Sequence, residues 1–493
     1  MRKLGTHPFI PILAAAVAGI IAANLFELPL WFAAGALLLS YILGAIRRED
    51  RLSAVYFATA VASLFFIVAT LSMPASEVAK GERVLTTMKL IEKRGTNGRW
   101  QNFDARLISY RKNGEWIGGH EKVILYIDTT YSVESGRQIA GWGYFNDLGE
   151  GSYANLMYRR GYGSRFYLVP GNLVAVSENR SLSPVTAAQN IREKALQRLE
   201  RLGLNVTSEA IAAAMTLGLR QGLDRETREN YTLSGTAHIL AISGLHVGMV
   251  FMIVNLLLMP LTLLNRFHIF KNILAVAILW LYAFVTGLSP SVIRATIMFT
   301  GTQAALASSS SRNSINTLLA AAAIMLLINP NYLYDMSFQL SFVAVLFIIL
   351  WMRLLHKVIN RRINRVLKWA ISFVAVSVFA SFAVAPLTAL HFDYFSTVGL
   401  LINPLIVCTA WVIVVATLVW MILPLGIAAP LFRLLINIPA GIQDSLVGWG
   451  ASRSWAGIET SIPWYSALLI YAVYLSITIL LYNLSERKRE FKV

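Results

Sequence analysis

The sequence is poor in charged residues and in cysteine. Asp, Glu, Lys and Arg make up 14% of the 493 residues, whereas a soluble domain of average composition carries about 25%. Long apolar runs take the place of the missing charges, which excludes an ordinary soluble protein. The one cysteine, Cys408, excludes an intramolecular disulfide and any cysteine-based zinc or iron–sulfur site.

Several apolar runs reach the length of about 20 residues that a helix needs to cross the bilayer. They are continuously apolar and do not alternate, so they predict helices rather than strands of a membrane barrel. Three runs follow one another at the start of the chain and are interpreted as retained helices rather than a cleaved leader. The runs lie at 8–26, 28–46, 53–71, 237–258, 273–288, 293–306, 315–328, 338–352, 370–390, 400–423 and 465–482.

The formal net charge is +17, from 43 Lys and Arg against 26 Asp and Glu. A nucleic-acid partner requires such an excess, because the phosphates must be neutralised. A multi-pass membrane protein also acquires basic cytoplasmic loops that fix its orientation, so the charge alone does not establish DNA. Both termini and the loops 47–51 and 353–368 are basic and are predicted to be cytoplasmic. Three full apolar runs lie between the loop 353–368 and the C-terminus. Two cytoplasmic segments must be joined by an even number of membrane crossings, and whether 427–449 is one of them is ambiguous.

Residues 74–180 form a soluble segment, predicted to be extracytoplasmic because the third run leads away from the cytoplasm. Its strand-like stretches are 84–92, 102–111, 116–128, 138–146 and 173–177. Asn113-Gly114 predicts a hairpin, because Asn-Gly readily adopts the positive φ angles of a type I′ turn. Five strands in so short a segment predict a small closed barrel, for which an OB-fold is one candidate.

The stretch 187–229 is an amphipathic helical segment. It is expected to lie along the membrane surface or to pack on the barrel. The predicted fold is a polytopic α-helical membrane protein with an inserted β-barrel domain. Its parts are N-terminal membrane helices at 1–73, the β domain at 74–180, a linker at 181–230, a second membrane domain at 231–484 and a basic tail at 485–493.

The stretch 235–248 is the most informative part of the chain. On a helix its small residues share one narrow stripe, which permits close packing of two membrane helices. The members of this stripe are Ala237, Ala241, Gly244 and Gly248. His238, Ser243 and His246 lie on the opposite side, which is typical of a helix lining a wet cavity. Other interpretations remain open: a nucleophile with its base, part of a metal site, or histidines that only satisfy buried hydrogen bonds.

Signatures of catalysis and metal binding are missing. His238 and His246 would lie about 12 Å apart along a helix, too far to hold one metal ion together. The sequence contains no HExxH, GxSxG or Walker-type glycine pattern. No metal, no cofactor and no enzymatic activity are therefore predicted.

Residues 238–250, HILAISGLHVGMV, resemble the signature of the ComEC-type competence family. Residues 286–295 match the family's Gly-x-x-x-Ser-x-x-Arg-Ala pattern, and 335–341 and 403–405 are weaker matches. The order of N-terminal helices, OB-like domain and competence membrane region is also that of the family. The resemblance implies a channel in the bacterial inner membrane that passes single-stranded DNA into the cytoplasm during natural transformation.

The resemblance also implies partners. They are single-stranded DNA, membrane lipid, a DNA receptor, and a cytoplasmic motor or strand-binding proteins, with the oligomeric state open. Many family members continue into a metallo-β-lactamase-like domain thought to degrade the strand that is not imported. This sequence has no HxHxDH-type cluster and ends shortly after its last apolar run, so that strand is expected to be removed by another protein or before the DNA arrives.

Ionisable residues inside apolar runs are functional candidates, because a charge in the membrane is costly unless it is paired or faces water. Arg294 and Asp335 are predicted to form an ion pair, although both could instead lie in the headgroup region. The residues predicted to line the channel are His238, Ser243, Gly244, His246, Ser291, Arg294, Asp335 and Gln339.

Aromatic and basic residues of the β domain are candidates for contact with DNA, since single-strand binders stack bases on aromatic rings. These residues are Trp100, Phe103, Arg106, Tyr110, Arg111 and Lys112. They could equally be the ordinary exposed and core faces of strands. The alternative function is a membrane enzyme acting on a lipid or envelope precursor through His238, Ser243 and His246. A third is a secondary transporter with helices broken at Pro290 and Pro404.

Overall fold

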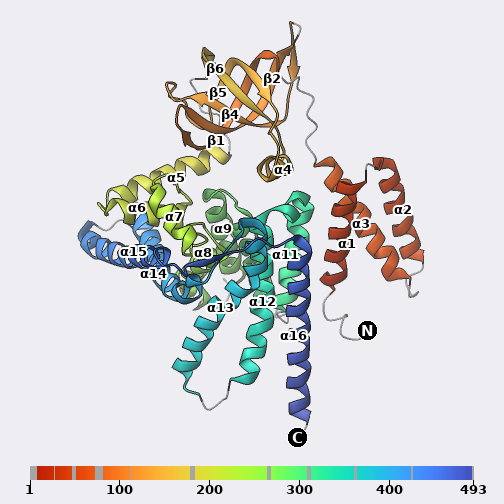
Figure 1. Ribbon diagram of the computed structural model, residues 1–493, viewed down its shortest axis with the longest axis vertical. Coiled ribbons are helices and arrows are strands. Elements are labelled where there is room, and N and C mark those ends of the chain that lie inside the picture. Colours follow the sequence, from red (N-terminus) through yellow and green to blue (C-terminus); the bar gives the residue numbers. More distant parts are fainter. Residues whose placement is uncertain are drawn as a thin grey trace. The chain divides into compact units, whose positions relative to one another are not determined.

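A computed structural model describes residues 8–26, 28–46, 52–72, 81–112, 114–177, 184–263, 268–307, 313–359, 363–423 and 426–490. The chain divides into two compact units, each with its own core. Figure 1 labels the helices and strands that build them. The barrel unit comprises Pro8–Ile191 and Ala323–Asp335, and the helical unit comprises Arg192–Ala322 and Met336–Val493. The domain boundaries predicted at 73/74 and 180/181, the N-terminal basic residues, the loop 47–51 and Asn113 lie outside the described residues.

Three N-terminal helices occupy the first three apolar runs. They are α1 (Phe9–Leu25), α2 (Leu30–Ile46) and α3 (Ser53–Leu71). Both α1 and α2 pack against α3. α3 is long and apolar enough to cross a membrane, and α1 and α2 are shorter apolar helices. The prediction of helices in these three runs is confirmed.

Gly19 permits a close approach of α1 to α3. A Cβ at this position would lie 2.1 Å from the carbonyl oxygen of Ala62, a backbone atom that has no free rotation. We expect Gly19→Ala to lower the free energy of unfolding by about 1–3 kcal/mol, as overpacking does. The matched control is Gly35→Ala in α2, because nothing lies within 4 Å of the Cβ added there. Equal unfolding temperatures of the two purified variants would contradict this packing.

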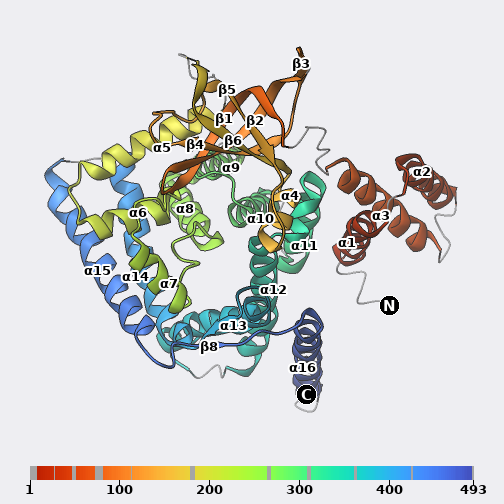
Figure 2. The ribbon, with the colours of Figure 1, turned by 45° about the horizontal axis from the view of Figure 1, so that its top comes forward.

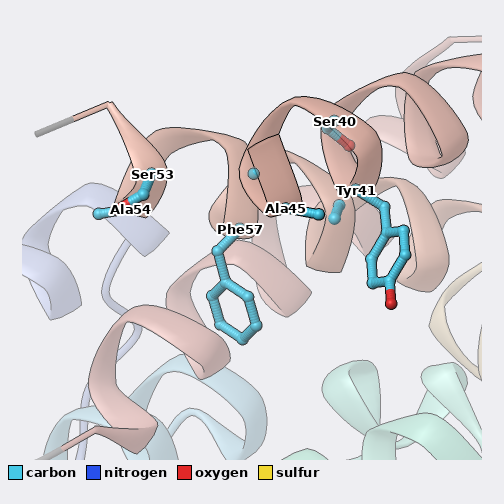
Figure 3. A pocket seen from close by; sticks show the side chains of 8 residues that line it. Ser40, Tyr41, Ala45, Ser53, Ala54 and Phe57 are labelled. Atoms are coloured by element: carbon cyan, nitrogen blue, oxygen red, sulfur yellow. The ribbon is translucent and has the colours of Figure 1, made fainter. Parts of the chain in front are cut away.

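α2 and α3 also border a hollow of about 410 Å³. Figure 3 shows its side chains, which include Tyr41 and Phe57. The hydroxyl of Ser40 in this lining donates to the carbonyl of Ala36 at 2.6 Å. None of the described residues that line the hollow is charged.

Six strands build the β domain. They are β1 (Arg83–Asn97), β2 (Trp100–Lys112), β3 (Glu115–Gly118), β4 (Lys122–Asp128), β5 (Gln138–Asn146) and β6 (Tyr162–Val176). Five of them close into a barrel in the order β1-β5-β6-β4-β2-β1, and β3 extends β2. All pairs are antiparallel except β4 and β6. The predicted small closed barrel is confirmed.

The strands differ in detail from the prediction. The stretch 116–128 divides into β3 and β4, and the stretch 173–177 is only the end of the long strand β6. The predicted hairpin is present: Lys112 pairs with Glu115, and Gly114 has a φ of +90°. Helix α4 (Ser152–Arg159) was not predicted. It covers Ile124 of β4 with Ala154 and Met157.

Asp128 fixes the end of β4. Its carboxylate accepts hydrogen bonds from the backbone N–H of Thr130 at 3.0 Å and from Nε of Arg99 at 2.5 Å. These two hydrogen bonds hold the pKa of the Asp128 carboxyl below its ordinary value, and the bond from Thr130 has the larger effect. A carboxyl with a lowered folded-state pKa stabilises the fold above its unfolded pKa of about 4.

We therefore expect the barrel to lose stability as the pH falls through the lowered folded-state pKa of Asp128. Asp128→Asn removes this contribution, so its unfolding temperature should be lower than that of the wild type at neutral pH and should change less on acidification. Glu115→Gln, on the exposed strand β3, is the control. If the unfolding temperatures of wild type and Asp128→Asn fall equally on acidification, Asp128 does not make this contribution to stability.

The linker contains three helices rather than one. α5 (Pro184–Glu200) contacts the barrel through Gln189, whose side chain donates to the Ile91 carbonyl at 2.7 Å. The next helix, α6 (Val206–Leu217), is almost wholly buried in the core of the helical unit. α7 (Arg225–Leu233) has Asp224 as its N-cap, and the Asp224 carboxylate accepts a hydrogen bond from the backbone N–H of Thr227. The expectation of one helix lying on the membrane or the barrel is therefore wrong for α6.

Nine further α-helices follow in the residues that the structure describes. They are α8 (Gly244–Leu257), α9 (His268–Val285), α10 (Pro290–Ala307), α11 (Ser314–Ile328), α12 (Met336–Val358), α13 (Arg365–Phe392), α14 (Val398–Ile422), α15 (Ala429–Ala451) and α16 (Trp464–Glu490). In the described residues six helices are long and apolar enough to span a membrane, namely α3, α12, α13, α14, α15 and α16. The ambiguous segment 427–449 is α15. Counting it gives four helices after the basic loop, the even number that the charges require.

Five helices of the helical unit form a closed circuit of contacts. α8 contacts α10 and α14, α12 contacts α10 and α13, and α13 contacts α14 (Figure 2). Pro404 lies inside α14 without ending it, so the predicted break at 403–405 is wrong. Pro290 is the first residue of α10, a position that tolerates the missing N–H.

Candidate functional site

The structure divides the segment that the sequence assigns to a single helix. Residues 234–243 lie outside helices, and α8 begins at Gly244 with Ser243 as its N-cap. Gly235 has a φ of +71°, a left-handed conformation common just after a helix end. Serine is a preferred N-cap residue. The prediction of a continuous helix from residue 237 is therefore wrong, and Ala237, Ala241 and His238 precede α8.

The helical part of the small-residue stripe does pack closely. A Cβ added to Gly244 would lie 3.5 Å from the Cβ of Ala295, and one added to Gly248 would lie 3.4 Å from the ring of Phe299. Both neighbours belong to α10. The predicted close-packing edge is confirmed for these two glycines.

His246 is held in one orientation by Ser243. Its Nδ1 accepts the backbone N–H of Ser243 at 3.0 Å and lies 2.9 Å from the Ser243 hydroxyl. Because Nδ1 is an acceptor here, the neutral ring carries its proton on Nε2. His246 is 1% exposed, and Nε2 has no hydrogen-bond partner among the described residues. The ring therefore presents a buried N–H donor to which no described residue offers an acceptor.

Arg294 lies against the start of α8 and has no counter-ion among the described residues. Its side chain is 6% exposed. The guanidinium donates to the Ser341 carbonyl and lies 5.6 Å from the Phe342 ring centroid. Its Nη2 would lie 2.7 Å from a Cβ on Gly244, so the absence of a side chain there makes room for the cation. Nε is buried and has no hydrogen-bond partner in the described part of the chain.

Three serines complete this cluster. The hydroxyl of Ser291, in the first turn of α10, lies 3.5 Å from that of Ser341. The hydroxyl of Ser289, immediately before α10, is buried without a partner in the described residues. Ser341, Phe342 and Ser289 were not predicted as site residues. Ser289 and Ser341 do fall inside the matched motifs, so the motifs were the sequence signal that could have identified them.

The other predicted channel residues make different contacts. Asp335 pairs with Arg160 at 2.7 Å, within the barrel unit. The predicted pairing of Asp335 with Arg294 is therefore wrong. The side-chain oxygen Oε1 of Gln339 lies 3.2 Å from Nε2 of His391. His238 is exposed, and its Nδ1 lies 3.2 Å from the Gly235 carbonyl. The structure thus brings together Ser243, Gly244, His246, Ser291 and Arg294.

Two of the aromatic residues predicted to contact DNA point into the barrel. Phe103 is 0% and Tyr110 5% exposed, and both belong to the barrel core. Their selection as stacking residues is wrong. Arg106 and Arg111 are exposed, and Arg111 donates to the Gly114 carbonyl at 3.1 Å. Lys112 is half-buried at the end of β2.

Trp100, in contrast, belongs to an outward row of aromatic side chains. Its ring meets that of Tyr167 edge to face at 5.9 Å, and Tyr167 stacks on Tyr126 at 4.4 Å. Tyr126, Tyr167 and Tyr144 are consecutive partners across β4, β6 and β5, and Tyr144 pairs with Arg83 of β1. We call Trp100, Tyr126, Tyr167, Tyr144 and Arg83 the aromatic belt.

The aromatic belt lies on the outside of the barrel. Successive side chains of a strand alternate between faces, and the neighbours Phe166 and Phe145 are fully buried. Tyr144 and Arg83 are exposed, and Trp100, Tyr126 and Tyr167 are half-buried. Arg83 also lies 5.7 Å from the ring centroid of Trp142. The belt therefore offers aromatic faces beside a cation on one surface.

These features define a multi-pass helical membrane protein with a β-barrel domain. No group of three or more His, Cys, Asp or Glu residues that could hold a metal is found in the part of the chain that the structure describes. The competence protein family model matches residues 215–486, which include the buried cluster. The chain belongs to this competence protein family, as its motifs predicted.

Three curated proteins are similar to the chain. An uncharacterized protein of Aquifex aeolicus is 33% identical over 198 residues, ComE operon protein 3 of Bacillus subtilis 30% over 200, and Recombination protein 2 of Haemophilus influenzae 24% over 241. The alignments cover 38%, 41% and 47% of this chain, respectively. They cover 46%, 24% and 30% of the relatives, so the chain matches less than half of each. No solved structure matches.

Proposed function

We propose that the protein passes single-stranded DNA across the inner membrane of a bacterium during competence. The observation that carries the proposal is the aromatic belt, in a membrane protein of the competence family. Stacked aromatic faces beside a cation are what proteins use to bind single strands without reading their sequence. In this proposal the barrel is an OB-type domain on the outside and both termini are cytoplasmic.

The helical unit would provide the route through the membrane. Its closed circuit of α8, α10, α12, α13 and α14 carries the buried cluster at the start of α8. The protein itself catalyses no reaction in this proposal. A DNA receptor would deliver the strand, and a cytoplasmic motor or strand-binding protein would pull it.

The proposal is tested by import of labelled DNA into cells that carry one copy of the gene. Import is scored as label protected from external nuclease, with membrane abundance of the protein checked. We expect import in wild-type cells, none in the deletion strain, and a strong reduction in the double variant Trp100→Ala/Tyr167→Ala. Trp116→Ala is the matched control, because Trp116 is an exposed aromatic residue on β3 outside the belt. Equal import by wild-type and deletion strains would overturn the proposal.

The contact between Ser243 and His246 favours a second candidate, a membrane enzyme acting on a lipid or envelope precursor. A hydroxyl 2.9 Å from an imidazole nitrogen is the arrangement of a nucleophile and its base. The same nitrogen also accepts the Ser243 backbone N–H, which is an N-cap arrangement. Ser243→Ala separates the candidates: loss of a lipid-processing activity with unchanged DNA import would favour the enzyme.

A further inference from the structure

The buried cluster collects hydrogen-bond donors without matching acceptors. Nε2 of His246, Nε of Arg294 and the hydroxyl of Ser289 are all buried and have no partner among the described residues. His246 lies in the first turn of α8, Arg294 lies in the second turn of α10, and Ser289 immediately precedes α10; the two helices contact each other. A buried donor without an acceptor is destabilising, and more so if it is charged. Three such donors near the starts of two contacting helices indicate that an acceptor from outside the chain binds there.

The charge of the cluster specifies the kind of acceptor. Arg294 is a permanent cation, and no carboxylate lies within salt-bridge distance of it in the described part of the chain. The N-termini of α8 and α10 add partial positive charge at the same place. The N–H groups at the start of a helix can face an anion, except for that missing at Pro290 and the His246 N–H that the Ser243 side chain caps. An uncharged ligand would leave the guanidinium uncompensated.

We propose that this cluster is a binding site for one phosphodiester group of the translocating strand. Arg294 supplies the charge, His246 Nε2 donates one hydrogen bond and Ser289 a second, each to a phosphate oxygen. One cation with neutral donors suits a transient contact, because a conducting site must bind strongly enough to admit its ligand and weakly enough to release it. The assignment of the strand as the source of the phosphate rests on the proposed function.

The binding step is tested on the full-length protein in neutral detergent, with dimethyl phosphate as the probe. This monoanion is the smallest phosphodiester, and trimethyl phosphate is its neutral counterpart. Saturating dimethyl phosphate is expected to raise the unfolding temperature of the wild type by about 2 °C or more, and trimethyl phosphate is expected to leave it unchanged. The shift should disappear in Arg294→Gln and persist in Arg365→Gln, a control that removes an exposed arginine at the start of α13.

A second variant tests the site independently in case Arg294→Gln does not fold. His246→Phe keeps a ring in the buried position but removes Nε2, so its shift with dimethyl phosphate should be reduced while its unfolding temperature without ligand remains measurable. An equal shift with trimethyl phosphate, or an unchanged shift in Arg294→Gln, would overturn the site.

The source of the phosphate is tested by import of strands that contain a block of neutral methylphosphonate linkages. Wild-type cells should import such strands at least several-fold more slowly than normal strands, whereas Arg294→Gln cells should import both at one reduced rate. If wild-type cells import both kinds of strand at the same rate and dimethyl phosphate still raises the unfolding temperature, the site binds a lipid headgroup. The proposal that it binds the strand would then be overturned. Failure of wild-type cells to import any DNA would overturn the proposed function, whatever the dimethyl phosphate result.

Discussion

Replacing Phe103 with alanine is expected to lower the free energy of unfolding of the barrel by about 3–5 kcal/mol. The Phe103 ring is fully buried in the core beside Leu125 and Phe166. The closed barrel has little room to collapse around the cavity left by the ring, because all five of its strands are fixed by pairing on both sides. Hydrogen exchange of β2 and β4 in the full-length protein measures the effect. Their amides should exchange about 100-fold faster or more.

Trp116→Ala is the control for this prediction. Trp116 is 52% exposed on β3, outside the closed barrel, and a surface substitution usually changes stability by less than about 0.5 kcal/mol. If Phe103→Ala exchanges like the wild type yet binds single strands poorly, then Phe103 is a surface stacking residue after all.

Replacing Tyr167 with alanine is expected to weaken binding of a single-stranded oligonucleotide by about tenfold or more, since stacking contributes about 1–3 kcal/mol per base. Tyr167 is the central ring of the aromatic belt, in contact with both Trp100 and Tyr126. Its loss removes one stacking surface and leaves its two neighbours without support. Fluorescence anisotropy with the purified full-length protein measures the affinity.

The salt dependence of binding separates stacking from charge. Tyr167→Ala should leave the slope of log affinity against log salt unchanged, because tyrosine carries no charge. Arg83→Gln should reduce the slope by about 0.7, the value for one phosphate contact on a single strand. A change of slope in Tyr167→Ala, or none in Arg83→Gln, would contradict this division of roles.

Elements with a simple pattern could be predicted from the sequence. The apolar run 53–71 is α3, and the alternating stretch 138–146 is β5, in both cases to the residue. The start of α8 could not be placed in this way. Ile239, Leu240 and Ile242 continue the apolar pattern through a loop in which they are buried, so hydrophobicity alone extends the helix backwards. The Ser243-Gly244 pair was the local signal for the true start.

The candidate site was predicted in part. Its matched motifs identified Ser243, His246, Ser291 and Arg294, which the structure places at the adjoining starts of α8 and α10. The partner of Asp335 could not be predicted, because Arg160 lies 175 residues earlier in the chain and no local pattern joins them. The belt likewise depends on strand register, and β1 and β2 shift register at three places. Register is set by pairing over the whole sheet.

The way the barrel closes also determines when it can fold during synthesis. Its last strand, β6, is the one that pairs with both β4 and β5. Until the ribosome has released residue 176, the nascent sheet has unpaired edges on β4 and β5, and such edges pair readily with other chains. Native contacts between β1 and β5 span more than fifty residues, which slows their formation. The domain is therefore most exposed to chaperones and to misfolding late in its own translation.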